Sequence, residues 1–133
     1  MKEKIIKFFY QDRYAAHSGI ELVDVKPGYA LTRMEIEDYH LNAVGVVQGG
    51  AIFTLADLAF AAACNSEGQL VLALNASINY FKPGLKGYLK AEAIKVSETR
   101  KTAFYEVTIT DAKGDIIARF SGTGFKKDET ITF

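Results

Sequence analysis

The sequence lacks several features that mark special classes of protein. It has one cysteine, Cys64, among 133 residues, which excludes a disulfide framework and a cysteine-based zinc site. Lysine plus arginine and aspartate plus glutamate number 16 each, so the chain has no positive excess of the kind that nucleic-acid-binding proteins carry. The most apolar stretch, residues 49–64, is shorter than the ~20 residues of a membrane span and contains Asp57. The sequence predicts one compact domain whose partner is a small molecule or a protein, and neither nucleic acid nor a membrane.

Targeting and catalytic motifs are scarce as well. The first residues do not combine the basic, apolar and small-residue segments of a signal peptide, so we expect a cytoplasmic protein. There is no strand-linked Gly-x-Gly-x-x-Gly, Walker loop, Gly-x-Ser-x-Gly elbow or His-x-x-x-His pair, and we expect no metal site. His17 and His40 lie in unrelated contexts, where a lone histidine is more often structural than catalytic.

Two segments have the pattern of helices. Residues 2–16 alternate apolar and charged side chains at helical spacing, which predicts an N-terminal helix within residues 1–18. Residues 49–67 are rich in alanine, leucine and phenylalanine, contain no proline and end before Gly68. Because this second helix is apolar nearly all round, we expect it to be enclosed by the rest of the domain.

The remaining segments alternate apolar and polar residues with the period of two that is typical of strands. A hairpin turns at Pro27-Gly28, a loop covers residues 37–47, and strands are predicted over 20–26, 29–35, 70–81, 85–98, 102–110 and 115–125. Strand 70–81 is expected to be half-buried, with Asn75, Ser77 and Asn79 on a polar face open to another subunit or a ligand. The glycines of 121–124 are expected to allow close backbone approach rather than phosphate binding.

This order of elements indicates a fold. One enclosed helix followed by four antiparallel strands, with a hairpin before it, predicts a single α+β domain over residues 1–133, in which an antiparallel sheet curls around the central helix.

The start of the central helix, Gln48-Gly49-Gly50, is the first candidate for chemistry. Two glycines let a substrate approach the bare backbone, and the unpaired N–H groups of a helix start favour an oxygen that gains negative charge. The spacing therefore outlines an oxyanion hole, and a simple tight turn is the alternative interpretation.

Asp57 is the second candidate, because a carboxylate in an apolar helix is costly unless it is paired or functional. A hydrogen bond to Asn65 or to a neighbouring strand is the structural alternative. Burial would raise the pKa of Asp57 and a donor such as Thr54 would lower it, so the sequence leaves the direction open.

Helical geometry separates these two candidates. Asp57 follows Gly49 by eight residues, which is about 12 Å along a helix axis. A reacting centre must lie within ~3 Å of both groups. If they cooperate, the acid comes from a second copy of the chain related by a two-fold axis, which gives two equivalent sites in a homodimer.

A family resemblance adds to this interpretation. The pattern Asn42-x-x-Gly45-x-x-Gln48-Gly49-Gly50-x-x-Phe53-Thr54-Leu55-Ala56-Asp57, with the following 59–66 and the strand end Tyr80-Phe81-Lys82-Pro83-Gly84, resembles the hotdog-fold thioesterases of the phenylacetate-pathway (PaaI-like) type. The resemblance covers roughly residues 20–126. It implies a hotdog fold, hydrolysis of acyl-CoA thioesters, a homotetramer built as a dimer of dimers, and no cofactor apart from the coenzyme A of the substrate.

The resemblance also implies roles for individual residues. The Gly49 N–H would polarise the thioester carbonyl, with the Asn42 side chain as a neighbouring donor. Asp57 of the partner subunit would activate water as a general base or attack as a nucleophile. Gln48 stands where relatives usually have histidine, so we expect it to position groups rather than transfer protons. Ala61 stands where some relatives carry a hydroxyl that holds the attacking water, which leaves that task to Thr54, to Asn65 or to no side chain.

Substrate contacts are predicted from position and charge. Gly50, Phe53 and Thr54 lie at the predicted site, and Phe53, Leu58 or the first helix would line the acyl pocket. The coenzyme A phosphates need cations, for which Lys82, Arg100 and Lys101 at strand ends are candidates by position and charge, and Asn79 on the strand is a further candidate contact.

Three functions remain open at this point. The first is an acyl-CoA thioesterase for small or medium acyl groups, with aromatic ones included. The second is a hotdog hydratase or dehydratase, which usually needs a catalytic histidine that this central helix lacks. The third is a non-catalytic protein that binds acyl-CoA or regulates a partner, in which Gln48 marks the loss of activity.

Overall fold

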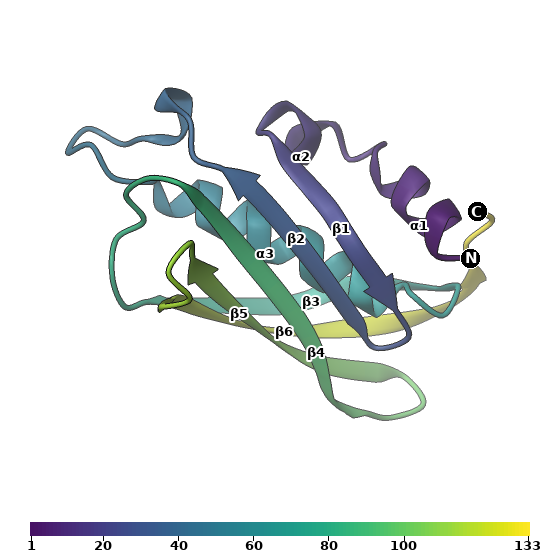
Figure 1. Ribbon diagram of the computed structural model, residues 1–133. Coiled ribbons are helices and arrows are strands. Elements are labelled where there is room, and N and C mark those ends of the chain that lie inside the picture. Colours follow the sequence, from purple (N-terminus) through teal and green to yellow (C-terminus); the bar gives the residue numbers. More distant parts are fainter.

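A computed structural model describes all 133 residues. One six-stranded antiparallel sheet curves around the helix α3 (Gly49–Cys64), as Figure 1 shows. Its strands are β1 (Ile20–Lys26), β2 (Tyr29–Glu35), β3 (Gln69–Tyr80), β4 (Tyr88–Glu98), β5 (Thr102–Asp111) and β6 (Ile116–Thr130). The predicted α+β class and enclosed central helix are confirmed. None of the helices has the length and apolarity that crossing a bilayer requires.

The sheet has the strand order β1-β2-β4-β5-β6-β3. Strand β3 pairs only with β6, from Gln69 opposite Thr130 to Tyr80 opposite Ala118, so its other edge is free. The last residue of β3, Tyr80, lies at the end of the sheet where α3 begins, because its hydroxyl bonds the Gly49 carbonyl, and Gln69 lies at the end where α3 finishes.

Helix α3 fills the concave side of the sheet with small and branched apolar side chains. Its buried residues include Ile52, Leu55, Leu58 and Ala59. Strand β6 approaches the helix through glycine: a Cβ on Gly122 would lie 2.8 Å from the Phe60 ring, closer than packed atoms tolerate. The prediction that the 121–124 glycines serve close backbone approach is confirmed.

One stripe of α3 is not covered by the sheet. It consists of Gly50, Thr54, Asp57, Ala61 and Cys64, which are spaced four and three residues apart, and these residues are half-buried or exposed. Side chains at this spacing share one face of a helix. We call this face the open stripe.

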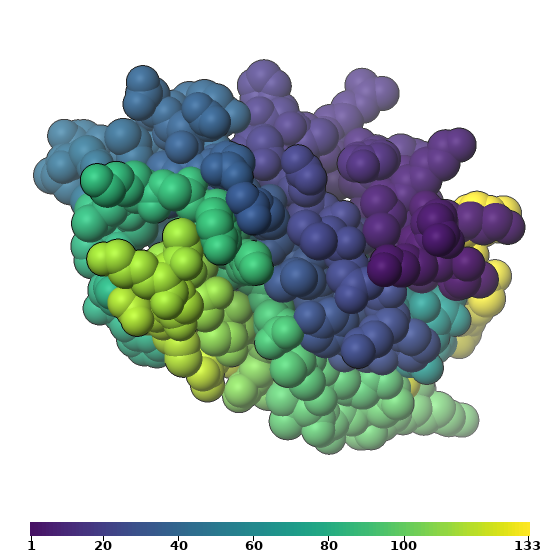
Figure 2. Space-filling view, viewed as in Figure 1, coloured from purple at the N-terminus to yellow at the C-terminus, as the bar shows by residue number.

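The N-terminal segment differs from the single helix that the sequence predicts over 1–18. It forms two helices, α1 (Lys2–Phe9) and α2 (Arg13–His17), because the Asp12 side chain accepts a hydrogen bond from the backbone N–H of Ala15 and starts a new helix. Helix α1 packs beside β1, and Figure 2 shows this purple segment next to the yellow end of the chain. Phe8 and Phe133 stack edge to face there at 5.5 Å.

Several element bounds also differ from the prediction. Helix α3 ends three residues early, because the side chain of Asn65 turns to bond the backbone of Val71. Strand β4 begins at Tyr88 rather than Leu85, and β6 continues to Thr130 because its last residues pair with the start of β3. These shifts leave the order of the elements unchanged.

The half-buried face predicted for β3 is wrong for its first half. Leu72 and Leu74 are 52% and 63% exposed. Irregularities in pairing lie between Gln69 and Val71 and between Ala73 and Asn75, and each one interrupts the alternation of faces.

Candidate active site

The start of α3 presents one free backbone donor. Gln48 is the N-cap residue, and its Oε1 accepts a hydrogen bond from the Gly50 N–H at 2.5 Å. The next two amides, of Ala51 and Ile52, donate to the Gln48 carbonyl. The Gly49 N–H donates to no group of the chain, so it is the donor that remains for an oxygen of a ligand.

Gly49 is held from the other side by Tyr80, a residue to which the sequence analysis assigns no role. The Tyr80 hydroxyl donates to the Gly49 carbonyl oxygen at 2.9 Å. A Cβ on Gly49 would lie 3.2 Å from the Tyr80 ring and from its hydroxyl oxygen. Tyr80 belongs to the strand-end pattern 80–84 that the sequence analysis quotes, so its residue type could have been noticed. Only the register between β3 and β6 places its ring on the start of α3.

Hydrogen bonds of Asn42 and His40 hold the loop that precedes α3. Asn42 Oδ1 accepts from the backbone N–H groups of Val44 and Val46, at 3.0 and 3.3 Å. Its side-chain NH₂ donates to no group of the chain and is exposed. The Asn42 amide thus keeps two unengaged N–H donors in the loop that precedes α3, and its role beside Gly49 stays a prediction.

His40 is buried and both of its ring nitrogens are engaged. Nδ1 accepts from the Glu37 N–H at 2.9 Å, and Nε2 lies 2.6 Å from the carbonyl oxygen of Ser18, at the end of α2. The His40 carbonyl in turn accepts from the Gln48 N–H at 2.8 Å. The residue is therefore a structural link, whereas His17 is exposed on α2.

Asp57 lies in the middle of the open stripe, half-buried, with no hydrogen bond and no ion pair within the chain. Burial raises its pKa above the ordinary value, and the negative charge of Asp12 raises it further. The two donors considered from sequence point elsewhere: Thr54 Oγ1 donates to the Gly50 carbonyl at 2.8 Å, and Asn65 Nδ2 to Ala61 and Val71. The sequence left the direction of the Asp57 pKa shift open, and the structure raises this pKa.

A single chain does not bring Asp57 to the Gly49 amide. The helix is continuous from Gly49 to Cys64, so the eight residue steps from Gly49 to Asp57 separate the two groups by about 12 Å along the axis. Figure 1 shows that the helix runs unbroken along the concave side of the sheet.

The predicted phosphate contacts are not gathered in one place. Lys82 is occupied by Asp115 at 2.9 Å and by Asp111 at 3.7 Å; the hydrogen bond to Asp115 raises the pKa of the lysine. Arg100 and Lys101 have no carboxylate partner and line a cavity of about 410 Å³. The other residues that line it are Gln69, Phe125, Lys126, Lys127, Asp128 and Glu129.

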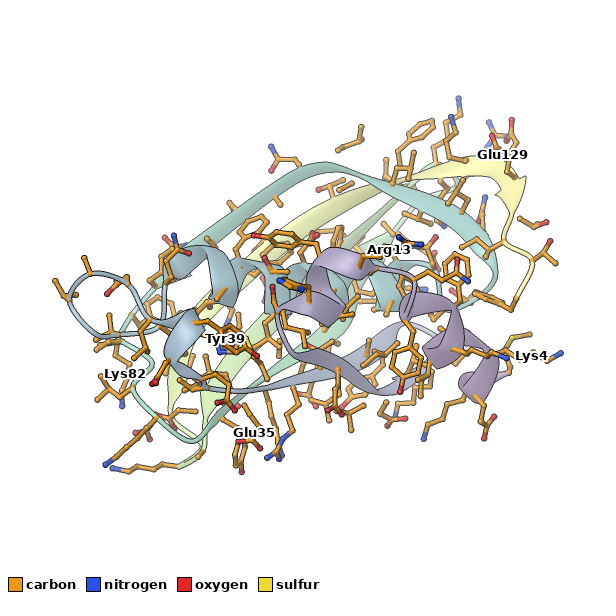
Figure 3. The ribbon with its side chains drawn as sticks, turned by 90° about the horizontal axis from the view of Figure 1, so that it is seen from above. Lys4, Arg13, Glu35, Tyr39, Lys82 and Glu129 are labelled. Atoms are coloured by element: carbon orange, nitrogen blue, oxygen red, sulfur yellow. The ribbon has the colours of Figure 1, made fainter.

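The sheet keeps Lys82 away from that cavity. The Lys82 N–H pairs with Ile117 and the Lys101 carbonyl with Lys126, and nine residues of β6 between these pairings span about 30 Å. Figure 3 shows the separation, with Lys82 and Glu129 at opposite ends of the molecule. Within one chain, therefore, Lys82 and the pair Arg100 and Lys101 lie at different ends of the sheet, because strand pairing decides which ends meet.

Phe53 and Asn79, two further residues predicted to contact the substrate, lie on different sides of the sheet. Phe53 is half-buried at the helix start and stacks on Phe120 at 5.3 Å. Asn79 precedes Tyr80, whose side chain contacts α3, so the alternation of a strand places Asn79 on the far face of the sheet. This is the polar face on which the sequence analysis places Asn79, so within one chain the residue faces away from α3 and its role as a substrate contact stays a prediction.

Known proteins are similar to this chain in both sequence and fold. A model of the thioesterase superfamily matches residues 44–118. A protein of Archaeoglobus fulgidus is 39% identical over 97% of this chain and 85% of its own length. Acyl-coenzyme A thioesterase PaaI of Escherichia coli is 32% identical over 93% of this chain and 89% of its own.

Solved structures agree. The E. coli PaaI structure superposes with a TM-score of 0.90 at 31% identity, covering 95% of this chain and 92% of that one. A Streptococcus mutans protein solved with bound acetyl CoA has a TM-score of 0.79 at 30% identity, covering 84% of this chain and 91% of that one. The chain belongs to the thioesterase superfamily. It is a thioester hydrolase of the PaaI-like type, and its fold is the hotdog fold, as the pattern from Asn42 to Asp57 implied.

Proposed function

We propose that the protein is an acyl-CoA thioesterase that hydrolyses small or medium acyl groups, aromatic ones included. The observation that carries the proposal is the Gly49 N–H, which is left without an acceptor at a helix start where the neighbouring Gly50 N–H is capped. The similarity to E. coli PaaI and to a structure that binds acetyl CoA supports acyl-CoA as the substrate class. The proposed chemistry uses water and protein groups alone, without a cofactor.

The active site is proposed to be shared by two copies of the chain. Asp57 lies about 12 Å from the tip of its own helix and faces outward on the open stripe. A two-fold axis that lays the stripes of two copies side by side, antiparallel, would bring Asp57 of the partner subunit to each Gly49 amide. The free edge of β3 offers a second place for contact between copies. The tetramer expected from the resemblance would pair two such dimers.

Hydrolysis would then proceed as follows. The carboxylate of Asp57 removes a proton from water, and the oxygen attacks the thioester carbonyl carbon. The carbonyl oxygen gains negative charge and accepts from the Gly49 N–H, with the Asn42 amide as a second donor. The tetrahedral centre collapses, the carbon–sulfur bond breaks, and the thiolate leaves as coenzyme A and takes up the proton. A raised pKa makes Asp57 a stronger base, provided that it is ionised.

The other residues at the helix start support this geometry. Gln48 caps Gly50 and so positions the backbone, without titrating near neutral pH. The Thr54 and Asn65 donors are already engaged with backbone carbonyls, so no side chain on the open stripe replaces the missing hydroxyl at Ala61. The attacking water would be held by Asp57 itself.

Arg100 and Lys101 are the better phosphate contacts, since the charge of Lys82 is neutralised by two carboxylates. Their cavity lies at the end of the sheet where α3 finishes. In the antiparallel dimer, that end of the partner lies beyond its Asp57, along the direction in which a coenzyme A arm would extend from Gly49. Phe53 and the half-buried aliphatic side chain of Ile78 would border the acyl group.

The decisive experiment follows thiol release from a panel of acyl-CoAs. We expect turnover by the wild type and a loss of about 10²- to 10⁴-fold in Asp57→Asn, the contribution of a general base. Glu21→Gln is the matched control, because it removes an exposed carboxylate from β1 and should keep full activity. A wild type that binds acyl-CoA but releases no thiol would establish the binding protein instead.

The shared site has its own test in assembly. Sedimentation of the wild type should give a dimer or a tetramer, and mixing Asp57→Asn with Gly49→Val chains should restore activity through the hybrid site that holds both intact groups. An active monomer would disprove the sharing. Single-turnover hydrolysis in H₂¹⁸O tests for the anhydride role of Asp57. Water that attacks the aspartyl carbonyl of an anhydride leaves the label in the Asp57 carboxylate, whereas a general base sends all of the label to the released acid.

A further inference from the structure

Tyr80 is the one side chain at the helix start that the proposed mechanism does not use. Its hydroxyl donates to the Gly49 carbonyl at 2.9 Å, and its ring lies against the Gly49 Cα, where an added Cβ would approach to 3.2 Å. The residue is half exposed and is the last of β3, a strand separated from α3 in sequence only by the turn at 65–68. A rigid sheet thus reaches the most flexible point of the helix.

The contact fixes one peptide group at both ends. The peptide that joins Gly49 to Gly50 has its carbonyl bonded by Tyr80 and its N–H bonded by Gln48 Oε1. Two successive glycines have the widest backbone freedom of any pair, and the first turn of a helix has no internal partners for its amides. Holding the following peptide on both sides therefore restricts the orientation of the free Gly49 N–H.

We infer that Tyr80 is a positioning residue, which together with Gln48 clamps the Gly49-Gly50 peptide so that the Gly49 N–H stays aimed at the thioester oxygen. The inference rests on the proposed thioesterase function. Tyr80 touches the backbone and not the reacting atoms, so it acts on the transition state through the direction of the donor. Its ring also explains why position 49 holds glycine.

The hydroxyl is suited to this role. Burial raises the pKa of Tyr80 above its ordinary value, so the phenol is protonated and remains a donor at neutral pH. The Gly49 carbonyl has no other side-chain partner, and no second hydroxyl of the chain reaches it.

The test compares Tyr80→Phe with the matched control Tyr29→Phe. Tyr29 also donates its hydroxyl, to Glu92 at 2.8 Å, but it lies in the β1–β2 hairpin at the far end of α3. Steady-state kinetics with a substrate that the wild type turns over gives kcat and KM separately. The amide resonances of Gly49 and Gly50 in a ¹⁵N–¹H spectrum report the clamp directly.

We expect Tyr80→Phe to lower kcat about three- to tenfold, the contribution of one hydrogen bond, with KM changed less than twofold and with shifted Gly49 and Gly50 resonances. Tyr29→Phe should leave kcat and both resonances as in the wild type. An unchanged kcat in Tyr80→Phe, while Asp57→Asn is inactive, would overturn the inference and leave the thioesterase intact. A wild type without thiol release would overturn the proposed function and this inference with it.

Discussion

Replacing Gln48 by glutamate tests the site in a single isosteric change. Gln48 Oε1 accepts from the Gly50 N–H at 2.5 Å, and a carboxylate would keep that contact while adding a negative charge at the start of α3. Gln48 is exposed, so the new glutamate would be ionised at neutral pH. The same charge would act in opposite directions on the fold and on the reaction.

The two effects have different sizes. A negative charge at a helix start stabilises a protein by about 0.3–1 kcal/mol, which raises Tm by about 1–4 °C in a domain of this length. The thioester oxyanion on the Gly49 N–H would lie about 6 Å from the carboxylate, two hydrogen-bond lengths away. At an effective dielectric of about 20 the repulsion is about 3 kcal/mol, or about a hundredfold in kcat.

Thermal unfolding and steady-state thiol release measure both effects on one preparation. Gln48→Ala is the comparison, since it removes the cap without adding charge and should lower stability by about 1 kcal/mol. Higher salt should return part of the activity of Gln48→Glu, because screening weakens the repulsion. A Gln48→Glu protein that is as active as Gln48→Ala would refute the placement of the oxyanion at Gly49.

Three other predictions follow from separate contacts. Asp12→Asn removes the like charge that raises the pKa of Asp57; because a base works when deprotonated, the acidic limb of the kcat/KM profile should move to lower pH, and a limb that stays in place would contradict this. Gly122→Ala forces a methyl group to within 2.8 Å of the Phe60 ring and should cost about 1–3 kcal/mol in urea unfolding, partly recovered by adding Phe60→Leu; an unchanged midpoint would show that the ring moves freely. Burial raises the pKa of Cys64 to about 12, so iodoacetamide should modify it about a thousand times more slowly than a free cysteine until the protein unfolds, and rapid labelling of the folded protein would disagree.

The central helix and the glycine-rich helix start were within reach of the sequence, because local patterns determine them. A helix that is apolar nearly all round must be covered by the rest of the domain, and residues 49–64 form such a helix on the concave side of the sheet. The separation of Gly49 from Asp57 also follows from helix geometry alone. The family pattern could be recognised from the same residues.

The positions that could not be predicted from the sequence are those that depend on how the strands pair. The register of β3 on β6 turns Tyr80 toward Gly49 and Asn79 away from it, and no local pattern contains that register. The 30 Å between Lys82 and Lys101 likewise depends on which strand ends meet. In the N-terminal segment, the Asp12 side chain accepts a hydrogen bond from the Ala15 N–H and divides one predicted helix into two. Hydrophobic spacing alone does not reveal this N-cap.

His40 connects the first nineteen residues to the start of α3. Through its ring and carbonyl it links Ser18 to the amide of Gln48, although residues 1–19 precede the 44–118 region that matches the superfamily. A change in this segment that displaces Ser18 would therefore reach the backbone of Gln48 through the ring and the carbonyl of His40. Exchanging this leading segment among relatives would therefore change the support of the helix start together with two core positions, Ile5 and Ala15.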